Sequence, residues 1–131
     1  MPEPEGTSCD LGLAYLWTGK VQEGEVLIRS AMERNPKLRY GEPCLRWGEF
    51  LLKQGRFTEA AAVLEKFQSI HSSSVEGNYL SGEAYRRSGE GAKATLAYQN
   101  ALEMFRQSPR YKRRVERQWA WKSRLRLLKP I

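Results

Sequence analysis

The side chains that could carry out chemistry are few in this chain of 131 residues. The single histidine, His71, precedes a run of serines at 72–74. A serine nucleophile and its histidine base normally come together from separate segments, so residues adjacent in sequence do not build such a site. The segment 89–95 lacks the adjacent Gly-Lys-Ser/Thr of a phosphate-binding loop. These patterns predict a solvated linker at 71–74 and no enzymatic activity.

The two cysteines, Cys9 and Cys44, lie 35 residues apart, and neither belongs to a C-x-x-C pair. A structural zinc site needs several Cys or His ligands at short spacings, which this sequence lacks. A disulfide is left open as an alternative, but two small buried thiols are the favoured interpretation. We therefore expect no metal, no cofactor and a reducing compartment.

Glycines recur in three pairs, and the members of each pair are seven residues apart. The pairs are Gly12 and Gly19, Gly48 and Gly55, and Gly82 and Gly89. A small residue follows each second glycine by five positions, and a larger apolar residue comes four positions later. These residues are Gly24 and Ile28, Ala60 and Leu64, and Ala94 and Tyr98. Each unit is typical of a helix, a glycine turn in the left-handed conformation, and a second helix that packs closely on the first.

This pattern resembles the tetratricopeptide repeat, a helix-turn-helix of about 34 residues with Trp, Leu-Gly, Tyr, Ala, Phe and Pro at fixed places. None of the three copies carries the tryptophan, because Ser8, Cys44 and Asn78 stand at its place. The first copy carries Leu11, Gly12, Tyr15, Gly19, Ala31 and Pro36 at those places. The second keeps Gly48, Gly55, Ala60 and Leu64, and departs from the pattern at Leu51, Phe67 and Ser72. The third keeps Gly82, Tyr85, Gly89, Ala94, Tyr98 and Ala101. The three copies span about 5–38, 41–74 and 75–108.

The resemblance implies an all-α fold, a right-handed superhelical α-solenoid of three antiparallel helix pairs plus a C-terminal capping helix. The periodicity predicts helices at 8–19, 21–34, 42–54, 58–70, 76–88, 91–107 and 109–128. Residues 1–6 are expected to form a flexible leader, and 109–131 the basic capping helix. Capping boxes are predicted to start at Thr7 and Ser73. The apolar positions predicted to cover the last repeat are Tyr111, Val115, Trp119, Trp121, Leu125 and Leu128.

In this family the first helix of each repeat lines a concave groove that holds a peptide or a partner protein. The groove residues implied here are Leu13, Trp17, Glu42, Arg46, Glu49, Lys53, Glu76, Tyr79, Glu83 and Arg86. The four glutamates among them occupy equivalent positions in two repeats and are expected to form two acidic columns. Such a groove would suit an extended or helical peptide with some basic side chains and an apolar anchor near Trp17. The alternative interpretation is that these charges are merely solvated.

The net charge of +7 is concentrated in the tail. From residue 106 onward the sequence holds ten Lys or Arg and one acidic residue, Glu116. The candidate binding residues in this tail are Arg110, Arg113, Arg114, Arg117 and Arg124. A basic helix with tryptophans can bind nucleic acid phosphate or an anionic membrane surface, which is the alternative function.

The favoured function is a non-enzymatic scaffold or adaptor that binds another protein or a peptide. A second copy of the chain is left open as a partner, beside nucleic acid and an anionic membrane. The sequence has no run of about eighteen apolar residues and no signal peptide. The expected location is the cytoplasm, or the soluble portion of a membrane-associated protein.

Overall fold

The computed structural model describes residues 5–35 and 37–128, and within them the chain is all-helical, with no strand. A short 3-10 helix, Leu38–Gly41, links the first two helix pairs. The α-helices of the described residues are α1 (Glu5–Trp17), α2 (Val21–Arg34), α3 (Glu42–Lys53), α4 (Phe57–Ile70), α5 (Val75–Arg87), α6 (Gly91–Gln107) and α7 (Arg110–Leu128).

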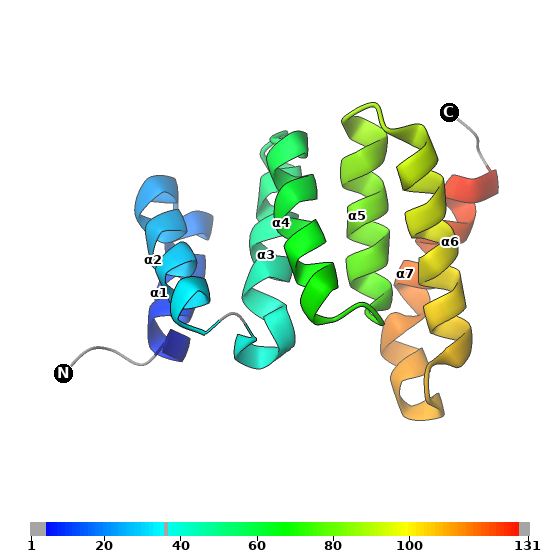
Figure 1. Cartoon of the computed structure of the whole chain (residues 1–131), viewed down its shortest axis with the longest axis horizontal. Coiled ribbons are helices and arrows are strands. Elements are labelled where there is room, and N and C mark those ends of the chain that lie inside the picture. The colour runs from blue at the N-terminus through cyan, green and yellow to red at the C-terminus, as the bar shows by residue number, and fades with distance from the viewer. Residues whose placement is uncertain (1–4, 36, 129–131) are drawn as a thin grey trace.

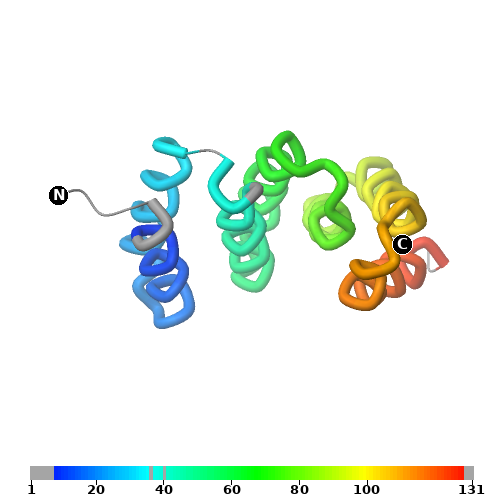
Figure 2. The backbone as a smooth tube through the Cα atoms, turned by 90° about the horizontal axis from the view of Figure 1, so that it is seen from below, coloured from blue at the N-terminus to red at the C-terminus, as the bar shows by residue number. Residues whose placement is uncertain are grey.

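The helices pack as neighbours in a row, from α1 and α2 at one end to α6 and α7 at the other (Figures 1 and 2). Within the pairs, α1 packs on α2, α3 on α4, and α5 on α6. Each odd-numbered helix also contacts the next odd-numbered one, whereas such contacts between even-numbered helices are sparse among the described residues. The arrangement is therefore repeat-like, and its odd-numbered helices form one continuous face.

Glycine allows the two helices of each pair to approach closely. An added Cβ at the first glycine of each unit would lie between 2.6 and 2.9 Å from a side chain of the facing helix. The contacts join Gly12 to Ile28, Gly48 to Leu64 and Gly82 to Tyr98. Carbon atoms that are not bonded do not come so close, so a larger residue would force the helices apart. The predicted role of these glycines is confirmed in all three units.

The second glycine of each unit ends the first helix. Gly19, Gly55 and Gly89 have φ angles of +95°, +78° and +87°. Other residues pay a Cβ penalty in this left-handed region, so glycine is the residue that turns the chain there at least cost. The predicted turns are confirmed.

The predicted helix bounds are correct for α2 and α6, differ by one residue at one end of α3, α4 and α7, and differ by one residue at both ends of α5. The prediction for α1 was wrong, because this helix begins at Glu5 and ends at Trp17. Thr7 therefore lies inside the helix and does not cap it, and residues 5 and 6 belong to α1 rather than to a leader. Residues 1–4 and 129–131 and Pro36 lie outside the described residues.

The cap of α5 also differs from the prediction. Ser74, and not Ser73, precedes the helix, and its Oγ accepts a hydrogen bond of 2.9 Å from the backbone N–H of Gly77. The hydroxyl satisfies one of the backbone donors that the first turn of a helix leaves unpaired. Glu76, the predicted partner in the capping box, instead binds Arg46 of α3.

The apolar core runs along the row, and Phe50 and Phe67 are its largest fully buried members. Cys9 and Cys44 are buried within it as free thiols, as predicted. Burial raises the pKa of both thiols to about 11. The two cysteines are therefore packing residues.

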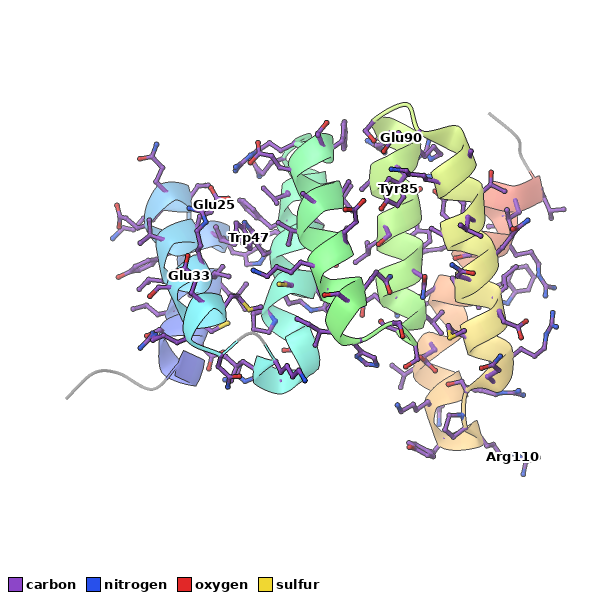
Figure 3. All side chains as sticks on the ribbon, viewed as in Figure 1. Glu25, Glu33, Trp47, Tyr85, Glu90 and Arg110 are labelled. Atoms are coloured by element: carbon purple, nitrogen blue, oxygen red, sulfur yellow. The ribbon has the colours of Figure 1, made fainter. Side chains whose placement is uncertain are left out.

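The junctions between pairs contain charged groups. Glu25 of α2 is only 9% exposed at the junction with the second pair. Its carboxylate accepts hydrogen bonds from Nε1 of Trp47 at 2.9 Å and from both terminal nitrogens of Arg56 at 3.2 Å (Figure 3). At the next junction, the Tyr85 hydroxyl donates to Glu65 of α4 at 2.5 Å. The helix pairs are thus joined by polar contacts as well as by apolar ones.

The last helix, α7, packs on α5 and α6 through a different stripe from the predicted one. Ala120 and Ser123 are buried, and Trp119 and Leu127 are partly buried against the core. Of the six positions predicted to cover the last repeat, only Trp119 does so. The other five are between 48% and 78% exposed, namely Tyr111, Val115, Trp121, Leu125 and Leu128. The small residues at 120 and 123 let α7 approach closely, and this places the larger side chains outside.

Candidate functional site

The face of the odd-numbered helices contains a hollow of about 440 Å³ between α3, α5 and α7. The side chains that line this hollow are Glu49, Leu52, Lys53, Tyr79, Leu80, Glu83, Arg87, Trp119 and Lys122. Four of them were predicted as groove residues from the sequence. The contribution of α7 to the groove was missed, because that helix was expected to cap the last repeat or to bind nucleic acid or a membrane.

Glu83 is the most constrained group of the hollow. Its carboxylate accepts hydrogen bonds from the hydroxyls of Tyr79, at 2.9 Å, and of Tyr98. It also accepts from Arg86 at 3.2 Å, and from Arg126 of α7 at 3.0 and 3.2 Å. The carboxylate thus holds α5, α6 and α7 together.

The charge state of Glu83 follows from these contacts. Burial alone raises the pKa of this carboxyl, but the hydrogen bonds from Tyr98, Arg126, Tyr79 and Arg86 outweigh burial and lower the pKa to about 2. Conversely, burial and the neighbouring carboxylate raise the pKa of Tyr79 to about 12. At neutral pH the hollow therefore contains an ionised carboxylate that is already saturated with donors.

Three of the four glutamates in the predicted acidic columns are ion-paired, namely Glu49, Glu76 and Glu83, whereas Glu42 is exposed. Arg46 lies between the two columns, with its guanidinium 2.9 Å from both carboxylate oxygens of Glu76 and 3.2 Å from Glu49. Glu83 is neutralised by Arg86 and Arg126. The prediction named Arg46 and Arg86 as groove residues but did not foresee that they would pair with the glutamates beside them.

Of the remaining predicted groove residues, Arg86 binds Glu83 at the hollow, and the other five do not line it. Glu42, Arg46 and Glu76 line a separate depression of about 300 Å³ nearer to α4. Trp17 is 51% exposed and packs edge-on against Phe50, with ring centroids 5.4 Å apart. Leu13 packs against the core.

Three cations give the hollow its free charge. Lys53 lies 4.7 Å from the ring centre of Trp17, and Lys122 lies 4.6 Å from that of Trp119. Arg87 lies over Phe57. These cations have aromatic neighbours, and no ion pair compensates them within the described residues. The hollow therefore combines a few apolar side chains, Leu52, Leu80 and Trp119, with uncompensated charges that are positive.

The basic residues predicted in the tail are all exposed on α7, namely Arg110, Arg113, Arg114, Arg117 and Arg124. Arg126, which the prediction did not single out, instead forms the ion pair with Glu83. The spacing of Trp119, Ser123 and Arg126 by three and four residues was the signal that could have identified the buried side of this helix. Binding of nucleic acid or a membrane by α7 stays a prediction.

The described residues offer no metal site, since no three His, Cys, Asp or Glu side chains gather in a suitable cluster. Within the same part of the chain, no helix has the length and apolar character needed to cross a bilayer. Comparison of the sequence with models of known protein families and with curated proteins finds no match.

Proposed function

We propose that this chain is a non-enzymatic protein-interaction module of the tetratricopeptide type, whose helix pairs follow a right-handed superhelical path. Three features support the proposal. The close glycine contact recurs in each of the three pairs, and a glycine with positive φ ends the first helix of each pair. Successive odd-numbered helices contact one another and form a continuous inner face, as in a curved stack.

We propose that a peptide of the partner protein binds across this face, in the hollow between α3, α5 and α7. The observation that carries this function is that side chains from three successive odd-numbered helices converge on one hollow. Leu52 and Leu80 provide apolar surface, and the charged groups lie around it. Binding sites for peptides and ligands typically combine an apolar floor with a few placed polar groups.

The charges of the hollow favour a peptide with acidic side chains. Glu83 is held by four partners and Glu49 by Arg46, so neither offers a free carboxylate to a basic peptide. Lys53, Arg87 and Lys122 are the charges left for a ligand. An acidic side chain placed among them would gain charge-assisted hydrogen bonds. The groups are also better suited to binding than to catalysis, because the hollow pairs no nucleophile with a base.

The proposal is tested by selecting peptides from a displayed random library against the whole chain and measuring their affinity by fluorescence anisotropy. We expect the selected peptides to be rich in Asp and Glu around an apolar residue. The double variant Lys53→Glu, Lys122→Glu is expected to weaken their binding by about tenfold or more, because it replaces attraction by repulsion.

The matched control is the double variant Lys66→Glu, Lys112→Glu. It changes the net charge equally, at exposed residues that do not line the hollow. Binding by this control should change by less than about threefold. If both variants lost the same amount of peptide affinity, or if neither variant changed that affinity, the hollow would not be the binding site.

A further inference from the structure

A second recess lies between α6 and α7, and no residue of α5 lines it. This α6/α7 groove measures about 410 Å³. Its lining consists of apolar side chains and arginines, namely Leu102, Phe105, Arg106, Arg113, Arg117, Ala120, Trp121 and Arg124. Among the predicted tail residues, Arg113, Arg117 and Arg124 belong to this groove.

The floor of the groove is apolar and only partly covered. Leu102 and Phe105 of α6 pack against the buried Ala120, while Trp121 is 57% exposed at the edge. Beyond Trp121, the same side of α7 carries Leu125 and Leu128, which are 48% and 71% exposed. A large tryptophan beside two leucines leaves apolar surface that a partner can bury.

The walls of the groove are positively charged. Arg117 and Arg124 form no hydrogen bond or ion pair with any described residue. Arg113 instead lies over the Phe105 ring and donates to the backbone carbonyl oxygens of Arg106 and Ser108, at 2.7 and 3.2 Å. The Arg113 contacts fix the corner where α6 meets α7, and they leave Arg117 and Arg124 as uncompensated charges.

The spacing of these charges matches that of a helix. Arg113, Arg117 and Arg124 lie on one side of α7 and span eleven residues, or about 17 Å. A helix laid along the groove can place acidic side chains at matching intervals and apolar side chains on the floor. From this complementarity we infer that the α6/α7 groove docks an acidic amphipathic helix of another protein.

A helix fits this surface better than a phosphate backbone does. Nucleic acid is held by contacts to its phosphates, and these would leave Leu102 and Phe105 without an apolar partner. A helix with an apolar stripe buries the floor and pairs its acidic residues with Arg117 and Arg124 at the same time. This inference does not depend on the hollow between α3, α5 and α7, because the two sites share no lining residue.

The test uses a displayed library of short helical peptides, selected against the whole chain. We expect enriched peptides that carry an apolar stripe flanked by Asp and Glu. The double variant Arg117→Glu, Arg124→Glu is expected to weaken their binding by about tenfold or more. Trp121→Ala, a change at an exposed residue, is expected to weaken the same peptides by a smaller factor. The variant Lys53→Glu, Lys122→Glu separates the two sites, since groove-bound peptides should bind it normally.

The matched control is Arg110→Glu, Arg114→Glu, which makes the same charge change on the same helix outside the groove lining. Arg110 is the first residue of α7 and lies at the N-terminal end of this helix (Figure 3). Equal loss in both double variants would overturn the inference, because it would indicate a general charge effect. So would failure to enrich acidic helices. The inference would also be overturned if the chain bound a single-stranded oligonucleotide or phosphatidylserine vesicles more tightly than the selected peptides, and if that binding required Arg117 and Arg124.

Discussion

The interfaces within the helix pairs differ in chemistry from the junctions between the pairs. Within each pair, a glycine faces one large side chain, and the contact is apolar and very close. Between pairs, carboxylates bind arginine or indole groups, as Glu25 and Glu76 do. Glu83 likewise joins the third pair to α7 through Arg126, and it also accepts a hydrogen bond from Tyr98 within that pair. Shape therefore defines each unit, while hydrogen-bonded charge joins one unit to the next.

This difference teaches where sensitivity to mutation should lie. A close contact with backbone cannot relax, because backbone atoms have no rotamers to change. A charged junction loses hydrogen bonds but can admit water or a substitute side chain. We expect the pair interfaces to dominate stability and the junctions to set how firmly neighbouring pairs hold together.

The largest effect is expected for Gly24→Ala in α2. An added Cβ would lie 2.6 Å from the backbone oxygen of Gly12 and 3.0 Å from the backbone nitrogen of Leu16. Both neighbours are main-chain atoms, so α1 and α2 would have to separate. We expect a loss of about 3 kcal/mol in the free energy of unfolding, measured by urea denaturation.

The control for this change is Gly91→Ala at the start of α6, where an added Cβ meets nothing within 4 Å. This variant should be neutral or slightly more stable than the parent chain, because alanine restricts the unfolded state. If Gly24→Ala lowered the free energy of unfolding no more than Gly91→Ala does, the close approach of α1 and α2 would not contribute to stability.

A smaller effect is expected for Glu83→Gln at the last junction. The amide keeps the shape of the side chain but leaves Arg86 and Arg126 without a carboxylate. We expect a loss of about 2 kcal/mol in the free energy of unfolding at neutral pH. The burial of Glu83 makes the loss large, and the partial exposure of Arg126 to water limits it. Hydrogen exchange should increase most in α7, and a uniform increase along the chain would contradict the local role of this junction.

The same variant tests the pH dependence. The pKa of Glu83 lies below its ordinary value of 4.5 in the folded chain, at about 2. The stabilisation is therefore complete above about pH 5 and is lost progressively as the pH falls toward 2. The melting temperature of the parent chain should fall more steeply across this range than that of Glu83→Gln. Parallel curves would show that Glu83 is not the group responsible.

For Arg56→Gln, at the junction between the first and second helix pairs, we expect a loss of about 1 kcal/mol in the free energy of unfolding. Arg56 binds Glu25 and Glu59, but a third of its side chain is exposed, so water can replace part of what is lost. Native-state hydrogen exchange should report faster opening of α1 and α2, with α5 to α7 unchanged. Equal effects at both ends of the row would mean that the chain unfolds as a single unit.

The sequence predicted the pair interfaces because their residues are close in sequence. The glycine and its partner, such as Gly48 and Leu64, are separated by a fixed interval that recurs three times, and the helical period places them on facing sides. The turn glycines follow equally from the local need for positive φ.

The junctions could not be predicted in the same way. Arg46 and Glu76, or Glu83 and Arg126, are 30 and 43 residues apart, and their pairing depends on how whole helices pack. The same limit explains the errors at α7, where Trp119 was placed correctly but its neighbours were assigned to the wrong side. A hollow lined partly by α7 was consequently outside the prediction.

The smallest effect is expected for Asp10→Asn, at a contact of the same chemical kind as the buried junctions. Asp10 of α1 accepts hydrogen bonds from Arg39 at 2.6 and 3.1 Å, and the hydrogen bonds lower the pKa of this carboxyl. The two side chains are 61% and 41% exposed, so water competes with the pair in both the folded and unfolded chain. The free energy of unfolding should change by less than about 0.5 kcal/mol, and only at low salt. A loss as large as that of Glu83→Gln would mean that geometry rather than burial gives the charged contacts their strength. The distinction between shape within the pairs and charge between them would then need a different physical basis.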